Sequence, residues 1–208
     1  MPIASAASRL TAAYNRHFDA HPLLTLTAAN GVLSSVSDVV AQGLGMALAD
    51  GERPAYDVAR TARFAAFGVG MGPVVGQWLR FLEYAVPMRG HAVRTTAARV
   101  LLDQAVFAPT GLTLFVGGMG LMEGRSRAQI ADKFDAVYWT ALKTNWKVWP
   151  AIQAANLGVV PLRYRLPFQQ TCGIVWNTYL SLLNSSKGAQ GKDVAPVKDG
   201  KPAPAGTP

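Results

Sequence analysis

The 208-residue chain has little charge and almost no cysteine. Only 15% of its residues are Asp, Glu, Lys or Arg, whereas an average globular protein has about 25%. Its single cysteine, Cys172, excludes an intramolecular disulfide and a CxxC metal site. The shortage of charge indicates that much of the surface faces something other than water.

Common enzyme motifs are also missing from the sequence. There is no HExxH pair for zinc and no GxSxG nucleophile elbow. Asp38 and Asp103 would form a catalytic dyad only if the fold held them within a few ångström, and nothing in the sequence brings them together. We therefore expect no enzymatic activity, no cofactor and no metal site.

The charge that is present is mostly positive, with a net charge of +8. The 20 Lys and Arg residues are scattered over every connection between apolar runs, without a dense block or a base-stacking aromatic motif. This distribution argues against nucleic-acid binding. It favours membrane lipid as the partner, since a basic surface is attracted to anionic headgroups.

Half of the residues, 50%, are hydrophobic, and they gather in long runs. A transmembrane helix needs about 20 apolar residues to cross a hydrocarbon core of about 30 Å. Four stretches approach this length: 23–49, 61–86, 100–122 and 166–184. We predict an all-α fold, a polytopic membrane helical bundle of about four transmembrane helices over residues 23–184.

A fifth apolar segment, 138–160, fits a span less well. Lys143 and Lys147 fall inside it, and Pro150 interrupts it. Two lysines near mid-membrane are costly unless they reach the headgroups. We predict either an amphipathic interfacial helix or a broken helix packed on the bundle. The tryptophans of this segment suit the interface, since indole rings favour the headgroup region.

The two ends of the chain differ from the apolar middle. Residues 1–22 carry Arg9 and Arg16, with Leu10, Tyr14 and Phe18 recurring every four residues. This pattern predicts a basic amphipathic helix, similar in composition to a mitochondrial transit peptide, which we interpret as an uncleaved interfacial segment. Residues 185–208 are rich in Lys, Gly, Ala and Pro and predict a disordered tail.

Glycines recur at helical spacing in the second predicted span. Gly68, Gly72 and Gly76 form two overlapping small-xxx-small repeats, and Pro73 follows the second glycine. Such repeats let two helix backbones approach closely, although a glycine-lined conduit or hinge is the alternative. In either case, a large residue at position 72 should disturb assembly.

Polar residues share one helical face of the first predicted span. They follow one another at intervals of three or four residues: Asn30, Ser34, Asp38, Gln42 and Gly45. This face cannot point at lipid, because a buried Asp costs about 2.5–3.5 kcal/mol on insertion scales. Asp38 should either pair with an arginine (Arg60, Arg63 or Arg99) or line an aqueous path.

Several separated patches resemble one known family. The first patches are Pro22, Asp38 with Ala41 and Gln42, then Asp57, Arg60, Arg63, Gly68, Gly72, Pro73 and Trp78, then Asp103, Gln104, Pro109, Glu123 and Gly124. The most specific patch includes Asn145, Trp146, Trp149, Pro150, Gln153, Asn156, Pro161, Arg165, Trp176, Asn177 and Tyr179. Ser37 and Leu157 stand where the family often has glycine and phenylalanine. Over about residues 20–185 the chain resembles the Mpv-seventeen and twenty-two-kilodalton peroxisomal membrane protein family, most closely its fungal Sym-one type.

The resemblance implies a four-span protein of the mitochondrial inner membrane or the peroxisomal membrane, proposed in the family to form a weakly selective channel. It also implies links to metabolite homeostasis, mitochondrial DNA maintenance and stress tolerance. The basic segment 1–22 favours the mitochondrion. We expect a pore for small solutes or ions, whose path includes Asp38, Gln42, Asp103, Gln104, Lys143 and Lys147.

The competing hypothesis is a non-conducting scaffold within a larger membrane complex or homo-oligomer. Pro73, Pro109 and Pro150 either free backbone groups for a solute site or only kink helices. Replacing Asp38 by Asn should separate the two hypotheses, since loss of conductance without loss of assembly would favour a pore.

Overall fold

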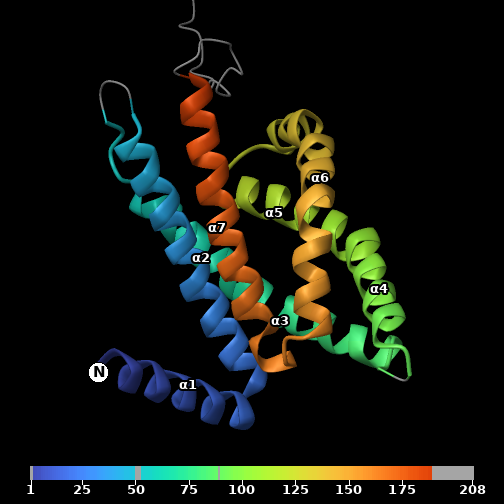
Figure 1. Ribbon diagram of the computed structural model, residues 1–208. Coiled ribbons are helices and arrows are strands. Elements are labelled where there is room, and N and C mark those ends of the chain that lie inside the picture. Colours follow the sequence, from blue (N-terminus) through green and yellow to red (C-terminus); the bar gives the residue numbers. More distant parts are fainter. Residues whose placement is uncertain (1, 50–52, 89, 189–208) are drawn as a thin grey trace, which may run out of the picture.

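The computed structural model describes residues 2–49, 53–88 and 90–188, with side chains from Ser8 to Trp176 and at Thr178 within those ranges. These residues form helices joined by short turns, which confirms the predicted all-α fold (Figure 1). The helices are α1 (Pro2–Ala20), α2 (Pro22–Ala47), α3 (Val58–Ala85), α4 (Ala92–Leu102), the π-helix η1 (Asp103–Phe107), α5 (Ala108–Met122), α6 (Arg127–Gly158) and α7 (Leu162–Gly188).

Two helical runs among the described residues are long and apolar enough to cross a membrane by length and composition. They are α2 and the continuous run Ala92–Met122, made of α4, η1 and α5. The other two predicted spans coincide with α3 and α7, which have 28 and 27 residues. At 1.5 Å per residue both exceed a core of about 30 Å, but their polar residues leave them less apolar than α2.

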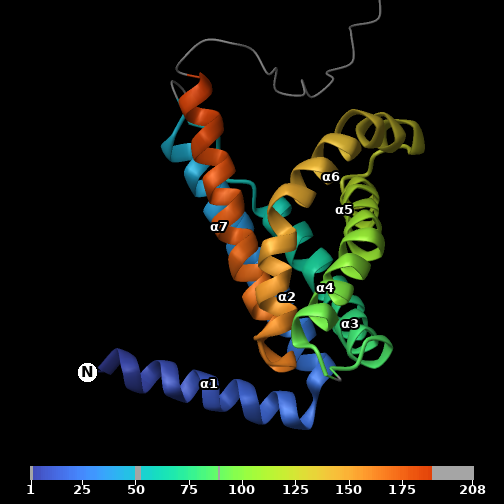
Figure 2. The same cartoon turned by 45° about the vertical axis from the view of Figure 1, so that its right-hand side comes forward.

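The fifth apolar segment belongs to α6, a helix of 32 residues that begins well before residue 138. A capping box of Ser126 and Gln129 fixes its first turn, and the helix continues through Pro150 without a break. Figure 2 shows α6 curving from the α5 end of the bundle down its side. The alternative that Pro150 breaks the helix is therefore wrong, since the chain remains helical to Gly158.

The N-terminal helix α1 lies at the lower end of the bundle in Figures 1 and 2, with its axis transverse to those of α2 and α7. The Tyr14 hydroxyl donates to the Arg163 carbonyl oxygen at 2.5 Å, and the Tyr164 hydroxyl donates to Asn15 Oδ1 at 2.7 Å. Burial raises the pKa of Tyr14 to about 12. These contacts attach α1 to the first turn of α7. Its predicted place at the membrane interface stays a prediction.

The boundary of the predicted tail shifts by a few residues. Helix α7 continues to Gly188, so the first four positions of the predicted segment 185–208 are helical. The rest of that segment, residues 189–208, lies outside the described residues. The small correction arises because Asn, Ser and Lys at positions 184–187 tolerate a helix that a neighbouring span has already nucleated.

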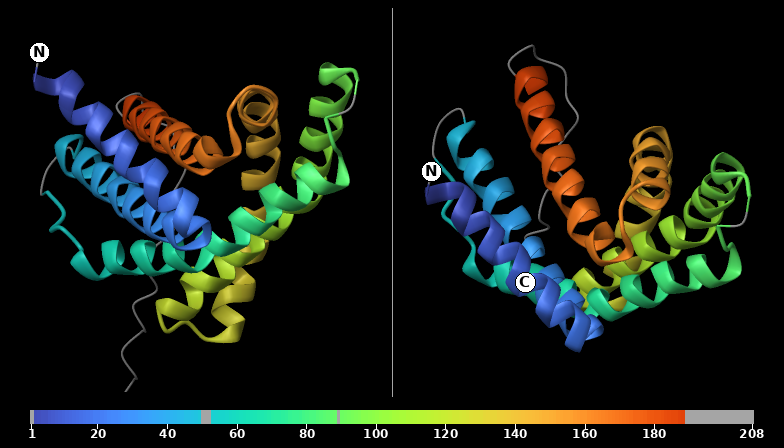
Figure 3. Two further views of the ribbon diagram at one scale, coloured as in Figure 1. Left: turned by 90° about the horizontal axis from the view of Figure 1, so that it is seen from below. Right: turned by 60° about the horizontal axis from the view of Figure 1, so that its bottom comes forward.

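Helices α2 and α3 approach each other more closely than side chains normally permit, and α2 also lies beside α7 (Figure 3). A Cβ atom added to Gly72 would lie 2.6 Å from Thr27 Cα, and one added to Gly68 would lie 2.7 Å from the Asn30 carbonyl oxygen. The Asn30 side chain donates from Nδ2 to the Gly68 carbonyl oxygen at 2.8 Å. The glycine repeat thus forms a closed helix contact rather than an open conduit in this structure.

Aliphatic side chains complete the core between the four long elements. Leu79 and Leu82 of α3, Leu157 of α6 and Leu166 of α7 are at most 1% exposed. They form one cluster with Leu26 of α2. This cluster lies toward the α1 end of the bundle, because the turn between α6 and α7 brings residues 157 and 166 together there.

We expect Gly72→Leu to destabilise the protein by at least about 1–3 kcal/mol, because the new side chain would overlap the backbone of α2. Gly70→Leu is the matched control, since nothing lies within 4 Å of a Cβ at that position. Thermal unfolding and size-exclusion profiles in detergent would measure the difference. Equal stability of the two variants would contradict the close contact between α2 and α3.

Candidate functional site

Two carboxylates are buried inside the membrane bundle, and they have different surroundings. Asp38 and Asp103 are 1% and 3% exposed. Asp38 lies between α2 and the beginning of α3, whereas Asp103 begins η1 and is contacted by α3 and α6. The structure therefore places the two residues in separate polar clusters.

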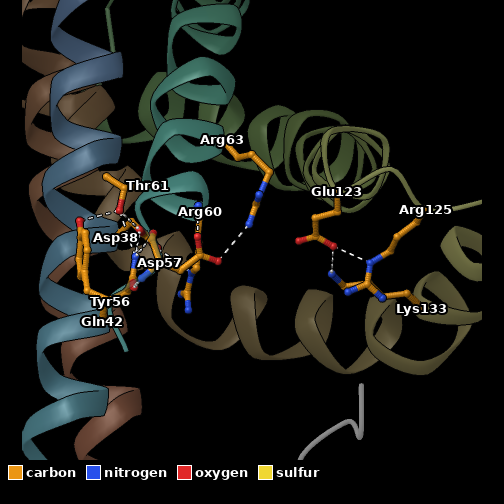
Figure 4. Close-up of polar contacts among 10 residues, drawn as sticks. All are labelled: Asp38, Gln42, Tyr56, Asp57, Arg60, Thr61, Arg63, Glu123, Arg125 and Lys133. Atoms are coloured by element: carbon orange, nitrogen blue, oxygen red, sulfur yellow. Dashed lines mark hydrogen bonds and ion pairs between the residues drawn. The ribbon is translucent and has the colours of Figure 1, made fainter. Parts of the chain in front are cut away.

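Asp38 is an ion-paired carboxylate (Figure 4). Its Oδ1 lies 2.8 Å from Arg60 Nε, while its Oδ2 accepts hydrogen bonds from Gln42 Nε2 at 2.7 Å and Thr61 Oγ1 at 2.6 Å. Of the three arginines considered from sequence, Arg60 is thus the partner. Arg63 pairs instead with Asp57, and Arg99 donates from Nε to the Val86 carbonyl oxygen at 2.9 Å.

Gln42 joins the Asp38 cluster to the N-terminus of α3. Its Oε1 accepts from the Asp57 backbone N–H at 2.7 Å, and its Nε2 donates to the Asp57 carbonyl oxygen at 3.0 Å. The Asp57 side chain in turn accepts from the Arg60 backbone N–H at 2.8 Å, as an N-cap. Asp38 and Gln42 consequently anchor α2 to the first turn of α3.

Further ion pairs lie near this anchor. Figure 4 shows Arg63 reaching Asp57 from one side and, beyond it, Glu123 with Arg125 and Lys133. The nitrogen-to-oxygen distances are 3.3 Å for Arg63–Asp57, 2.5 Å for Arg125–Glu123 and 3.7 Å for Lys133–Glu123. These residues lie near the start of α3 and around the turn between α5 and α6, positions from which long basic side chains can reach lipid headgroups.

Asp103 differs from Asp38 because neutral groups surround it. Trp78 Nε1 donates to its Oδ1 at 2.9 Å. Gln104 Nε2 and Gln153 Nε2 donate to its Oδ2 at 2.9 Å and 2.8 Å. Among the described side chains, none forms an ion pair with Asp103.

The backbone at Asp103 is also unusual. The run from Asp103 to Phe107 is a π-helix, and the Ala108 N–H donates to the Asp103 carbonyl oxygen five residues back. Pro109 follows directly and has no N–H to donate back into this turn. Single π-turns within long helices are frequent at functional sites, because they redirect side chains that a regular helix would place elsewhere.

A cavity of about 900 Å³ opens beside Asp103, between η1, α5, α6 and α7. This volume lies in the range of about 300–1,000 Å³ that is typical of small-molecule sites. The polar side chains on its wall are Asp103, Gln104, Thr140, Thr144, Asn145, Gln153 and Gln169, and the aromatic ones are Phe107, Trp149 and Trp176.

Further hydrogen bonds hold the amide side chains of the cavity wall in place. Asn156 Nδ2 donates to Gln153 Oε1 at 3.0 Å, and Asn145 Nδ2 lies 3.4 Å from Gln104 Oε1. Trp146 Nε1 donates to the Gln104 carbonyl oxygen at 3.0 Å. Because its Oε1 faces Asn156, Gln153 turns its amide nitrogen toward Asp103.

The predicted path residues do not all meet at this cavity. Asp103 and Gln104 lie on its wall, whereas Asp38 and Gln42 belong to the anchor between α2 and α3. Lys143 and Lys147 are exposed on α6 and do not line the cavity. A role for these two lysines in a path stays a prediction without support from this geometry.

The signature residues of the C-terminal half lie mostly around the cavity. Trp149, Gln153 and Trp176 line it, Trp146 and Asn156 bond to its wall, and Pro150 continues α6 beside it. Pro161 lies in the turn before α7, where its carbonyl oxygen accepts from the Tyr164 N–H at 2.9 Å. The side chain of Asn177 lies outside the described residues.

Sequence reasoning missed two partners of Asp103. Trp78 and Gln153 were recognised only as parts of a family pattern, although both donate to the carboxylate. A signal for Gln153 was present, because residues at intervals of three or four share one face of a helix. Asn145, Trp149, Gln153 and Asn156 follow that spacing along α6.

The described residues contain no group of three or more His, Cys, Asp or Glu side chains that could hold a metal ion. Asp103 therefore has amide and indole donors around it rather than further ligands for a metal. The arrangement can accept one more hydrogen bond or one positive charge from a molecule in the cavity, because a carboxylate offers about four lone-pair sites.

We expect Asp38→Asn to lower the free energy of unfolding by about 1–3 kcal/mol, since it removes the negative charge that pairs with Arg60 and puts an amide NH2 group in place of one of the two accepting oxygens. Asp57→Asn is the matched control, because Asn also caps helices and position 57 is exposed. Chemical denaturation in detergent would compare the variants. A stable Asp38→Asn protein would show that this cluster is not an anchor.

Comparisons with known proteins agree with the predicted family. The model of the Mpv17 / PMP22 family matches residues 120–181. Protein sym1 of Schizosaccharomyces pombe is 39% identical over 86% of this chain and 93% of its own length. Protein sym-1 of Neurospora crassa is 40% identical over 82% and 96%. The rat protein named mitochondrial inner membrane protein Mpv17 is 38% identical over 81% and 94%.

No solved structure matches the chain. The extent of the match to these relatives nevertheless settles the assignment, since each covers more than four fifths of this chain and more than nine tenths of its own length. The predicted location, the mitochondrial inner membrane, is confirmed by the same relatives. The chain belongs to the Mpv17 / PMP22 family of membrane proteins.

Proposed function

We propose that the chain forms a pathway for small cationic solutes across the mitochondrial inner membrane, and that the Asp103 cavity is its central part. Such a pathway would support metabolite homeostasis in the organelle and, through it, mitochondrial DNA maintenance or stress tolerance. The observation that carries the proposal is the buried carboxylate of Asp103, which faces a cavity and has no cationic partner among the described side chains.

The energetic argument begins with the cost of the buried charge. An Asp at the centre of a membrane helix costs about 2.5–3.5 kcal/mol on insertion scales. At Asp38 an arginine compensates this cost. At Asp103 three neutral hydrogen bonds compensate only part of it. A carboxylate that a fold retains at such a cost is a functional-site candidate.

The alternative is a non-conducting scaffold, which the tight contact between α2 and α3 also suits. That contact lies on the far side of α3 from Asp103, however, and explains nothing about the cavity. Four membrane spans leave room for a narrow path only, so a complete pathway needs either small solutes or several subunits in a homo-oligomer or larger complex.

Reconstitution in planar bilayers tests the proposal. We expect the wild-type protein to show discrete openings with cation preference under a salt gradient. In Asp103→Asn the reversal potential should move toward zero, because the cavity wall loses the one charge that its described side chains carry. Asp132→Asn is the matched control, since it removes an exposed acid of α6 with the same change in net charge.

A second pair of variants separates blockage from loss of charge. Gly173 lies on the cavity wall, where a Cβ would be 3.8 Å from Trp149 Cη2, so Gly173→Leu should fill the cavity and reduce conductance. Gly117→Leu, at a position of α5 with nothing within 4 Å of a Cβ, should conduct normally. A folded wild-type protein that stays silent in repeated preparations would favour the scaffold.

A further inference from the structure

The cavity beside Asp103 has the features of a binding site for one particular class of solute. Of the side chains that line it in the described part of the chain, Asp103 is the only charged one. The site therefore presents a single negative charge. An occupant that neutralises it carries one positive charge, since a dication would leave one charge without a partner among the described side chains of the wall.

The three donors to the Asp103 carboxylate leave one of its lone-pair sites unused. Trp78 occupies one position on Oδ1, and the amides of Gln104 and Gln153 both occupy Oδ2. Since two carboxylate oxygens offer about four lone-pair sites, one site remains, on Oδ1. A single N–H group or a diffuse cation held close to that oxygen would complete the shell.

The rest of the wall suits an organic cation better than an inorganic ion. Inorganic cations such as Ca²⁺ and Mg²⁺ bind through six or more close oxygen ligands, and hard ions of this kind are held mainly by carboxylates and carbonyls. The carboxylate here already receives three N–H donors. No cluster of acidic or other metal-ligating side chains lies among the described residues.

Aromatic rings on the cavity wall offer a second kind of contact for an organic cation. Phe107, Trp149 and Trp176 contribute to the same wall as Asp103. Indole and phenyl faces attract ammonium groups, and the attraction is stronger where the rings and the cation are less hydrated. The cavity volume of about 900 Å³ is far larger than a bare metal ion needs and matches a small metabolite.

We propose that this cavity binds a small organic monocation, with its ammonium or guanidinium group beside Asp103 and its carbon skeleton against Phe107, Trp149 and Trp176. This inference rests on the proposed function and names the class of solute that the pathway recognises. Binding alone does not require conduction, so the two can be tested separately.

The test measures binding to the full-length protein in detergent by isothermal titration calorimetry and by ligand-dependent thermal stability. The probes are three ammonium ions of rising size: ethylammonium, choline and phenethylammonium. The matched neutral probe is 3,3-dimethylbutan-1-ol, which replaces the quaternary nitrogen of choline by carbon. Sodium and magnesium chloride at equal ionic strength report any response to inorganic cations.

We expect at least one organic ammonium ion to bind and stabilise the wild-type protein, with the neutral analogue and the inorganic salts giving no comparable shift. Asp103→Asn should weaken binding by roughly tenfold or more, as is typical when the charged partner of a buried interaction is removed. Gly173→Leu should also abolish binding while leaving Asp103 in place. Asp132→Asn and Gly117→Leu should bind like the wild type.

Three results would overturn the proposal. They are equal binding of choline and its neutral analogue, unchanged binding in a folded Asp103→Asn protein, and the absence of binding by all three ammonium ions. If the protein binds none of them but still conducts with a cation preference that depends on Asp103, the pathway stands and only its assignment to organic cations fails. Circular dichroism and size-exclusion profiles would establish that each variant is folded.

Discussion

The structure depends most on how the membrane bundle accommodates the Asp103 carboxylate. Three neutral donors from α3, η1 and α6 converge on its two oxygens, so one side chain fixes the relative positions of three helical elements. The π-turn at Asp103 directs the carboxylate toward Gln153 and Trp78, and the amide of Gln153 is itself oriented by Asn156. A cavity forms on the remaining side, because α7 contributes Gln169, Gly173 and Trp176 there rather than a row of aliphatic side chains.

The two buried carboxylates lie on opposite sides of α3, one in a closely packed region and the other beside a cavity. On one side of α3 the glycine repeat and the Asp38 cluster bring α2 to backbone contact, which leaves no space for a solute. On the other side Asp103 faces a cavity and no arginine approaches it. The two aspartates thus have different roles. The ion pair of Asp38 stabilises a helix contact, whereas the Asp103 carboxylate, which has no cationic partner among the described side chains, attracts a cation.

The sequence predicted the helical class, the approximate positions of four long helices and the family, because apolar runs and spaced motifs carry that information directly. It also indicated that Asp38 could pair with an arginine, although the choice among Arg60, Arg63 and Arg99 depends on where α3 begins. It could not separate Asp38 from Asp103, since both appear as lone acids in apolar runs and only the helix packing assigns them to different clusters. Three further features depend on tertiary contacts, which local spacing does not encode. They are the exposure of Lys143 and Lys147, the continuity of the helix through Pro150, and the π-turn.

The central claim is that the Asp103 cavity is open to aqueous solutes and carries a negative potential. Its most direct test is the rate at which a cysteine on the wall reacts with charged thiol reagents. In a Cys172→Ser background, Thr144→Cys would place a single thiol on the cavity wall. The account predicts that a cationic methanethiosulfonate modifies this thiol faster than an anionic one, and that Asp103→Asn removes most of the difference. A thiol that resists both reagents, or that reacts with both at equal rates while Asp103 is present, would contradict it.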